Sequence, residues 1–321
     1  MGMLAALNRV NPCSYNQDPT MRKLINVVPF GLPSQKPVHT KNVLKGVITG
    51  IDKGDFVIIW GGGIYNWFDP LTLIKAMAKV AGRRSDIKLF FLGIKHPNPQ
   101  VKELSLVNDT VALSDKLGLT GKSVFFNFDW VDYDARQDYF LESDIGIITH
   151  PEHIETRFAF RTRILDYLWT GLPVISTEGD SLSELVKNEG LGLTVASKDI
   201  SGLADAILKM AQDKNFYQEC KKKVPEVASG YTWEKVCAPL ISFCMDPVSS
   251  AVRKKLRADQ IHTQSSMPDI EASMMRPGGT FSGSSGNRRS AGYLIRRFFY
   301  HLFKSGPKKT MEYSSNVIKG N

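Results

Sequence analysis

The sequence is poor in cysteine, and its cysteines form no pattern that binds a metal or builds a disulfide framework. The 321 residues include four cysteines, at positions 13, 220, 237 and 244, and no two of them have CxxC spacing. No pair of the six histidines has the spacing of metal ligands on a helix. We therefore predict no metal site and a reducing compartment.

Long hydrophobic runs are missing as well. No apolar stretch is long enough to span a bilayer, and residues 1–12 lack the basic start and apolar core of a signal peptide. The glycines Gly61, Gly62 and Gly63 do not form a GxGxxG motif, because position 66 is Asn, and no GxSxG or Cys–His pattern is present. We predict a cytoplasmic protein that uses neither a dinucleotide motif nor a Ser or Cys nucleophile.

Positive charge is in excess. The formal net charge is +9 and the pI is near 9.2, which favours an anionic partner. Nucleotide phosphate, anionic lipid and nucleic acid all qualify. Because the basic residues are scattered or lie in the tail, and no nucleic-acid motif occurs, nucleic acid is the least favoured of the three.

Short apolar segments alternate with amphipathic ones from residue 55 onward, which predicts an α/β fold with one doubly wound parallel sheet. The predicted strands are 56–60, 89–92, 123–128, 144–148, 174–175 and 193–195. The predicted helices are 71–80, 100–117, 135–142, 161–169, 182–188, 200–213 and 215–245. Ligands of such sheets bind beyond the carboxyl ends of the strands, so the loops there form the predicted site.

Composition divides the chain into four parts. Residues 1–54 are irregular, with a possible helix at 3–10, turns at 11–20, a short strand at 24–31 and a linker after it. Residues 55–246 form the predicted domain. Residues 247–290 are rich in Ser, Gly, Pro and Met and are predicted to be disordered. The basic, apolar tail 291–321 resembles an interfacial membrane helix, although a helix docked on its own domain is the alternative.

The stretch from His150 to Thr177 carries the main candidate site. Thr162, Arg163 and Asp166 share one helical face, because Asp166 follows Thr162 by four residues and Arg163 by three. A helix start with a guanidinium beside it is a natural seat for phosphate, and a carboxylate one turn later can accept hydrogen bonds from a ribose diol. The alternative is a solvated charged face.

Further candidates follow other predicted strands. The three glycines at 61–63 would let backbone approach a ligand closely, or would only form a tight turn. Asp69 precedes Pro70 as a helix cap, and Trp130 can stack on a base or sugar or pack in the core. Glu155 follows a strand in a loop near Arg161, where a surface salt bridge is the alternative role.

These residues resemble those of glycosyltransferase family 4 (group 1). The segment from Leu165 to Ile175, LDYLWTGLPVI, looks like that family's LEAMAxGxPVI helix, and WGGGIYNWFDP at 60–70 looks like its first glycine loop. Residues 24–242 would then be the donor-binding, Rossmann-like C-terminal half of the two-domain GT-B fold. The resemblance implies retaining transfer of a sugar from a nucleoside-diphosphate sugar to a glycan or glycolipid acceptor, without a metal or other cofactor.

The resemblance also implies roles for individual residues. Asp166 would hold the donor ribose. The segment 128–131 resembles the part of the family that contacts the base. The predicted donor-binding residues are Gly61, Gly62, Gly63, Asp69, Trp130, Arg161, Thr162, Arg163 and Asp166. The family's first acid would stand at position 158, which is Phe158, so the nearby Glu155 becomes the predicted catalytic acid.

The family's N-terminal acceptor domain has no counterpart beyond residues 1–31, so we expect a truncated or split-gene product that transfers weakly unless a separate acceptor-domain chain joins it. Three other hypotheses stay open: a non-catalytic peripheral membrane or partner-binding protein, a nucleic-acid binder, and a sugar-nucleotide epimerase of related fold.

Overall fold

The computed structural model describes residues 2–22, 24–94, 98, 100 and 104–245. The predicted disordered linker 247–290 and the predicted tail helix 291–321 lie outside these residues.

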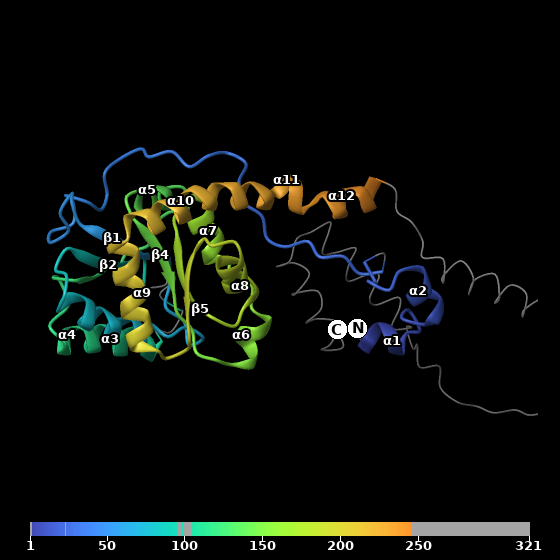
Figure 1. Ribbon diagram of the computed structural model, residues 1–321, viewed down its shortest axis with the longest axis horizontal. Helices are drawn as coiled ribbons and strands as arrows, with labels where there is room; N and C mark the ends of the chain where they lie inside the picture. Colours follow the sequence, from blue (N-terminus) through green and yellow to red (C-terminus); the bar gives the residue numbers. More distant parts are fainter. Residues whose placement is uncertain (1, 23, 95–97, 99, 101–103, 246–321) are drawn as a thin grey trace, which may run out of the picture. The chain divides into compact units, whose positions relative to one another are not determined.

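Six strands of the described residues form one parallel sheet (Figure 1). The strands are β1 (Phe56–Trp60), β2 (Ile87–Phe91), β3 (Val124–Phe126), β4 (Ile145–Ile148), β5 (Val174–Thr177) and β6 (Gly192–Val195). Their order is β3-β2-β1-β4-β5-β6, and every neighbouring pair is parallel. The order changes direction between β1 and β4, so the predicted doubly wound sheet is confirmed and its switch point lies between these two strands.

The helices of the domain connect these strands. They are α3 (Pro70–Ala81), α4 (Ser105–Lys116), α5 (Arg136–Leu141), α7 (Arg163–Trp169), α8 (Ser181–Asn188), α9 (Ile200–Gln212) and α10 (Lys214–Ala228). Helix α3 packs against α4 and α9, whereas α7 packs against α10 and contacts α5 through side chains. The sheet is therefore covered on both faces, as its uninterrupted apolar strands require.

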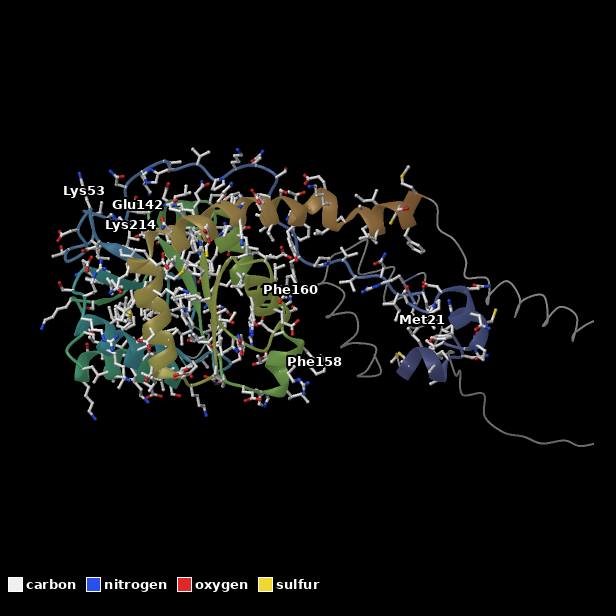
Figure 2. All side chains as sticks on the ribbon, viewed as in Figure 1. Met21, Lys53, Glu142, Phe158, Phe160 and Lys214 are labelled. Carbon is white, nitrogen blue, oxygen red and sulfur yellow. The ribbon has the colours of Figure 1, made fainter. Side chains whose placement is uncertain are left out.

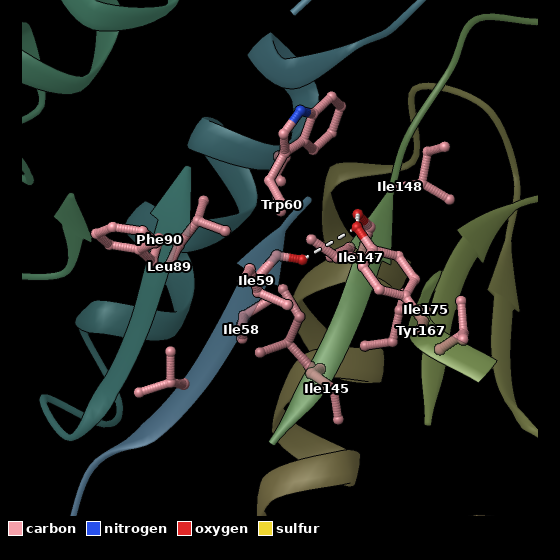
Figure 3. Packing of buried hydrophobic residues seen from close by; sticks show 14 of the residues in the cluster. Ile58, Ile59, Trp60, Leu89, Phe90, Ile145, Ile147, Ile148, Tyr167 and Ile175 are labelled. Atoms are coloured by element: carbon pink, nitrogen blue, oxygen red, sulfur yellow. Dashed lines mark hydrogen bonds between the residues drawn. The ribbon is translucent and has the colours of Figure 1, made fainter. Parts of the chain in front are cut away.

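The centre of the sheet is the core of the domain (Figure 3). Ile58, Ile59, Ile145 and Ile147 are fully buried on the two strands that flank the switch point. Tyr167 of α7 is also fully buried and reaches the same two strands. The core thus fixes α7, which carries Arg163 and Asp166, against the two strands at the switch point.

Several predicted elements differ from the structure. Residues 24–31 form no strand, and only Leu32 makes an isolated bridge, to Thr232. Residues predicted as turns contain α2 (Pro12–Gln17), and the predicted helix 3–10 is limited to α1 (Gly2–Ala6). The loop predicted after β4 contains α6 (Ile154–Phe158). The long helix predicted over 215–245 is broken after α10 into a 3-10 turn (Ser229–Tyr231), α11 (Trp233–Val236) and α12 (Ala238–Met245).

Residues 30–45, here called the strap, run in extended form along the domain and are fixed to α5 by two carboxylates. Asp138 accepts hydrogen bonds from the backbone N–H of Thr40 at 2.6 Å and from its hydroxyl at 2.7 Å. Glu142, marked in Figure 2, accepts three consecutive backbone N–H groups of residues 43–45 at 2.8–2.9 Å. These bonds satisfy backbone groups that have no sheet or helix partner.

We expect the Glu142 contact to make the domain sensitive to acid. Burial would raise the pKa of Glu142, but the bonds from His39 and from backbone 43–45 bring it below its ordinary value. A lowered folded pKa means that the carboxylate stabilises the fold above the ordinary pKa of glutamate, and that this stabilisation is lost as the pH falls through the lowered value. E142Q is expected to lower the free energy of unfolding at neutral pH by about 1–2 kcal/mol.

Urea denaturation at neutral pH and at about pH 3 measures this effect. The difference between wild type and E142Q should shrink in acid, whereas E226Q, a change at an exposed glutamate, should match wild type at both pH values. A constant difference between wild type and E142Q at both pH values would show that the charge of Glu142 has no such role.

Candidate functional site

The loops that follow β1 and β4 meet at the carboxyl edge of the sheet. The backbone N–H of Asp69 donates to the carbonyl of Thr149 at 2.8 Å, and the Thr149 hydroxyl donates to the carbonyl of Asp69 at 2.6 Å. These bonds join the two loops at the switch point, the place where ligands of such sheets bind.

Tyr167 fixes the start of the glycine loop from the core side. Its hydroxyl oxygen accepts the backbone N–H of Gly61 at 3.0 Å and lies 2.9 Å from the Ile147 carbonyl and 3.2 Å from the Ile59 carbonyl (Figure 3). Burial raises the pKa of Tyr167 to about 12, so at neutral pH the hydroxyl keeps its proton and donates it to one of these carbonyls. One side chain therefore ties β1, β4 and the loop together.

The three glycines of the loop have different structural reasons. A Cβ on Gly61 would lie 2.7 Å from the Phe140 ring, so packing by itself requires a glycine here. Gly62 has φ +123°, a conformation that favours glycine. A Cβ at this position would lie nearest to the guanidinium of Arg163. Gly62 and Gly63 are the two positions at which the loop faces a charged group.

Arg163 lies beside this loop. Its Nη2 donates to the carbonyl of Gly63 at 2.7 Å, and its guanidinium carbon lies 4.9 Å from the Trp60 ring centroid and 4.5 Å from that of Phe68. Burial lowers the pKa of Arg163, although an arginine remains charged near neutral pH. Its Nη1 is buried and has no hydrogen-bond partner among the described residues. A charged donor without a partner at a ligand-binding edge is a candidate anion contact.

A second guanidinium lies on the same aromatic ring. Arg161 is only 6% exposed, and its guanidinium carbon lies 5.5 Å from the Phe68 ring centroid. Its Nη2 donates to Glu155 at 2.7 Å, while the Glu155 side chain is 46% exposed. Phe68 thus brings Arg161 and Arg163 together, and Glu155 balances one of the two charges from the solvent side.

Helix α7 has only seven residues and begins at Arg163. The phosphate site predicted at its start therefore depends on the two guanidiniums, because so short a helix has few aligned peptide dipoles. Thr162 occupies the cap position, is exposed and makes no capping hydrogen bond.

The carboxylate of Asp166 is neither buried nor turned into the core. Its side chain is 31% exposed, and its Oδ1 accepts a hydrogen bond from Nη2 of Arg136 at 2.9 Å. Asp166 is thus a part-exposed, ion-paired carboxylate, which agrees both with the predicted ribose contact and with the solvated-face alternative. Nothing in the sequence pairs Arg136 with Asp166, because they lie on different helices and 30 residues apart.

Three other positions complete the comparison with the sequence. The Asp69 carboxylate accepts both the backbone N–H and the hydroxyl of Thr72, at 3.0 and 2.7 Å, so it caps α3. Trp130 is exposed on the loop after β3. Phe158, at the position of the family's first acid, is exposed at the end of α6 (Figure 2). Glu155 lies on that helix, where a loop was predicted.

A cavity of about 520 Å³ lies where α3, α4 and α9 begin, and Phe68 forms part of its wall. Asn66, Lys75, Ser105 and Lys198 line it, and of the predicted site residues only Asp69 does so. Within the described ranges no cluster of His, Cys, Asp and Glu is arranged to hold a metal ion, and no helix is long and apolar enough to cross a membrane.

Comparison with protein families decides the classification. Residues 55–213 match the family model described as "Glycosyl transferases group 1". These residues belong to the group 1 glycosyltransferases. The resemblance stated from the sequence is thus confirmed for the segment that builds the sheet and carries all of the predicted site residues.

Individual relatives of this glycosyltransferase segment have low sequence identity to it. Sucrose-phosphate synthase of Zea mays is 27% identical over 169 residues, which are 52% of this chain and 15% of that protein. A crystal structure of the C-terminal domain of a glycosyl transferase group 1 family protein (LpcC) from Francisella tularensis has a TM-score of 0.50, with 17% identity, and the match covers 63% of this chain and 99% of that one.

The sucrose-phosphate synthase of Thermosynechococcus elongatus has a TM-score of 0.50, with 16% identity, over 76% of this chain and 57% of that one. These structures show the fold, which is the GT-B half predicted from the sequence. The chain spans about one seventh of the maize relative, so the activity of a whole enzyme does not transfer to it by similarity.

Proposed function

We propose that this chain binds a nucleoside-diphosphate sugar at the carboxyl edge of β1 and β4 and supplies the donor half of a glycosyl transfer. The observation that carries the proposal is the buried, unpartnered Nη1 of Arg163 beside Gly62 and Gly63. Arg161, whose guanidinium also lies near the Phe68 ring, adds a second positive charge. Such a pair suits a diphosphate, which carries negative charge on both phosphates.

In this proposal the bond between the anomeric carbon and the diphosphate oxygen breaks, and an acceptor hydroxyl oxygen forms the new bond to that carbon. The acceptor proton leaves to a base, and the nucleoside diphosphate departs with the bonding electrons. Arg161 and Arg163 stabilise the charge that develops on this leaving group. We further propose retention of the anomeric configuration, and no cofactor is needed beyond the donor.

Asp166 and Glu155 receive separate roles. Asp166, half-buried next to Arg136, accepts hydrogen bonds from the ribose hydroxyls. Glu155 is exposed enough to reach the donor sugar, and donor phosphates that attract Arg161 would release it from its present ion pair. Trp130, exposed on the loop after β3, stacks on the base.

The acceptor in this proposal is a carbohydrate hydroxyl, in line with the name of the maize relative, a synthase of sucrose phosphate. A glycan or glycolipid is the form we propose from the sequence. A separate chain that carries an acceptor domain would complete the cleft.

Isothermal titration of the full chain with UDP, GDP and ADP tests donor binding. We expect one of the three to bind at micromolar to millimolar concentrations, and its nucleoside monophosphate to bind more weakly because it lacks the second phosphate. Absence of heat with all three would overturn the proposal.

The second candidate function is non-catalytic binding of a partner or a membrane. It is favoured by α12, on which no residue is buried and Leu240, Ile241 and Phe243 are exposed. Sedimentation with anionic liposomes, with and without residues 291–321, tests the membrane form. Equal sedimentation of both chains would remove the tail from this proposal.

A further inference from the structure

Arg136 is an enclosed charged side chain that touches Asp166, a proposed ligand residue. It is the first residue of α5 and is only 8% exposed. Its guanidinium carbon lies 3.2 Å above the Tyr133 ring centroid and 5.3 Å from that of Trp169. Its Nη1 donates to the Tyr133 carbonyl, and its Nη2 donates to Oδ1 of Asp166 at 2.9 Å. The planar group is therefore fixed by stacking as well as by hydrogen bonds.

The position of Arg136 does not depend on Asp166. Helix α5 is fastened to the strap through Asp138, and Trp169 donates from Nε1 to the carbonyl of Gln35 at 2.8 Å. The strap thus contacts both helices that carry the pair, α5 and α7. A guanidinium held in this way can orient a neighbouring carboxylate, because only the carboxylate is free to turn.

A carboxylate needs a defined orientation to recognise a diol. Free rotation about the side-chain bonds would spread its lone pairs over many directions and cost entropy on binding. With Oδ1 held by Arg136, rotation of the Asp166 carboxylate is restricted before a ligand arrives. The remaining acceptor capacity then points in one direction, which is the condition for discriminating one hydroxyl arrangement from another.

We infer that Arg136 is a positioning residue that orients the Asp166 carboxylate and thereby sets the preference for ribose over deoxyribose in the donor. This inference rests on the proposed function, in which Asp166 binds the ribose hydroxyls. Arg136 acts only through Asp166 and takes no direct part in the chemistry.

The test compares a nucleoside diphosphate with its 2′-deoxy analogue, using the base that binds best to wild type. We expect wild type to prefer the ribonucleotide about tenfold, the value of one hydrogen bond to a charged group. D166N should lose most of this preference. R136M should lose it as well, down to within about twofold, while its affinity for the deoxynucleotide stays near that of wild type. A purely structural role would weaken both ligands equally.

R136K provides the second variant, because lysine keeps the charge but lacks the planar fork. Its ratio is expected between those of wild type and R136M, and it carries the test alone if circular dichroism shows that R136M does not fold. A wild-type ratio in a folded R136M or R136K variant would overturn the inference. Absence of diphosphate binding by wild type would instead refute the proposed function.

Discussion

Replacing Arg163 with alanine is expected to weaken nucleoside-diphosphate binding about 30-fold to 100-fold, the value of one or two charge-assisted hydrogen bonds. Arg163 is the guanidinium nearest to Gly62, and its buried Nη1 has no partner among the residues described. A bound phosphate would satisfy that nitrogen, so the loss on mutation should be larger than that of an exposed charge. Isothermal titration of wild type and R163A with the best-binding nucleotide measures it.

R83A is the matched control for R163A. Arg83 is an exposed arginine that pairs with the exposed Asp205 at 3.3 Å, away from the candidate site, so its removal changes the net charge by the same amount. R83A should bind the nucleotide like wild type. Equal weakening in both variants would mean that only the overall positive charge of the chain attracts the ligand.

A large effect on stability is expected from a side chain at Gly146, in β4. A Cβ at this position would lie 2.3 Å from Cγ of Tyr167, closer than any real contact. The Tyr167 ring cannot withdraw without breaking its bonds to the backbone of β1, β4 and the glycine loop. G146A is therefore expected to lower the free energy of unfolding by about 3 kcal/mol, at the upper end of overpacking effects.

Urea denaturation of G146A and G54A measures this steric effect. A Cβ on Gly54 has no neighbour within 4 Å, so G54A should unfold within about 0.5 kcal/mol of wild type. If G146A were as stable as wild type, Tyr167 would not be held against β4 as described.

The sheet could be predicted from the sequence because its strands are nearly uninterrupted apolar runs between helices with apolar periodicity. Such patterns depend on local spacing. Each predicted strand of the sheet begins and ends within two residues of the observed one. The strand predicted at 24–31 is wrong. Its prediction depends on Val27 and Val28, which are residues typical of strands. In the structure both are exposed, and Pro29 and Pro33 leave the chain fewer N–H groups for pairing.

Two short helices were missed for different reasons. Helix α2 carries an ordinary start signal, Asn11 as cap followed by Pro12, but Asn and Pro are also typical turn residues. Helix α6 is capped by His153, whose Nδ1 accepts the backbone N–H of Glu155 at 3.2 Å. Histidine is not among the usual capping residues, so the sequence offered little signal for α6.

In the candidate site, too, some features could be predicted from the sequence and others could not. The sequence places the glycine loop and Arg163 after predicted strands, and therefore at one edge of the sheet, whereas their contact depends on β1 and β4 being neighbours, which the structure shows. The roles of Phe68 and Arg136 did not follow. Phe68 joins two guanidiniums, and Arg136 meets Asp166 from another helix, and such contacts depend on packing between elements distant in sequence.

A crystal structure of the chain with its best-binding nucleoside diphosphate tests the central claim most directly. Density for the phosphates should appear beside Gly62 and Arg163, with the ribose hydroxyls within hydrogen-bond distance of Asp166. Phosphates in the cavity near Lys75 and Lys198 instead, with Nη1 of Arg163 still without a ligand, would contradict it.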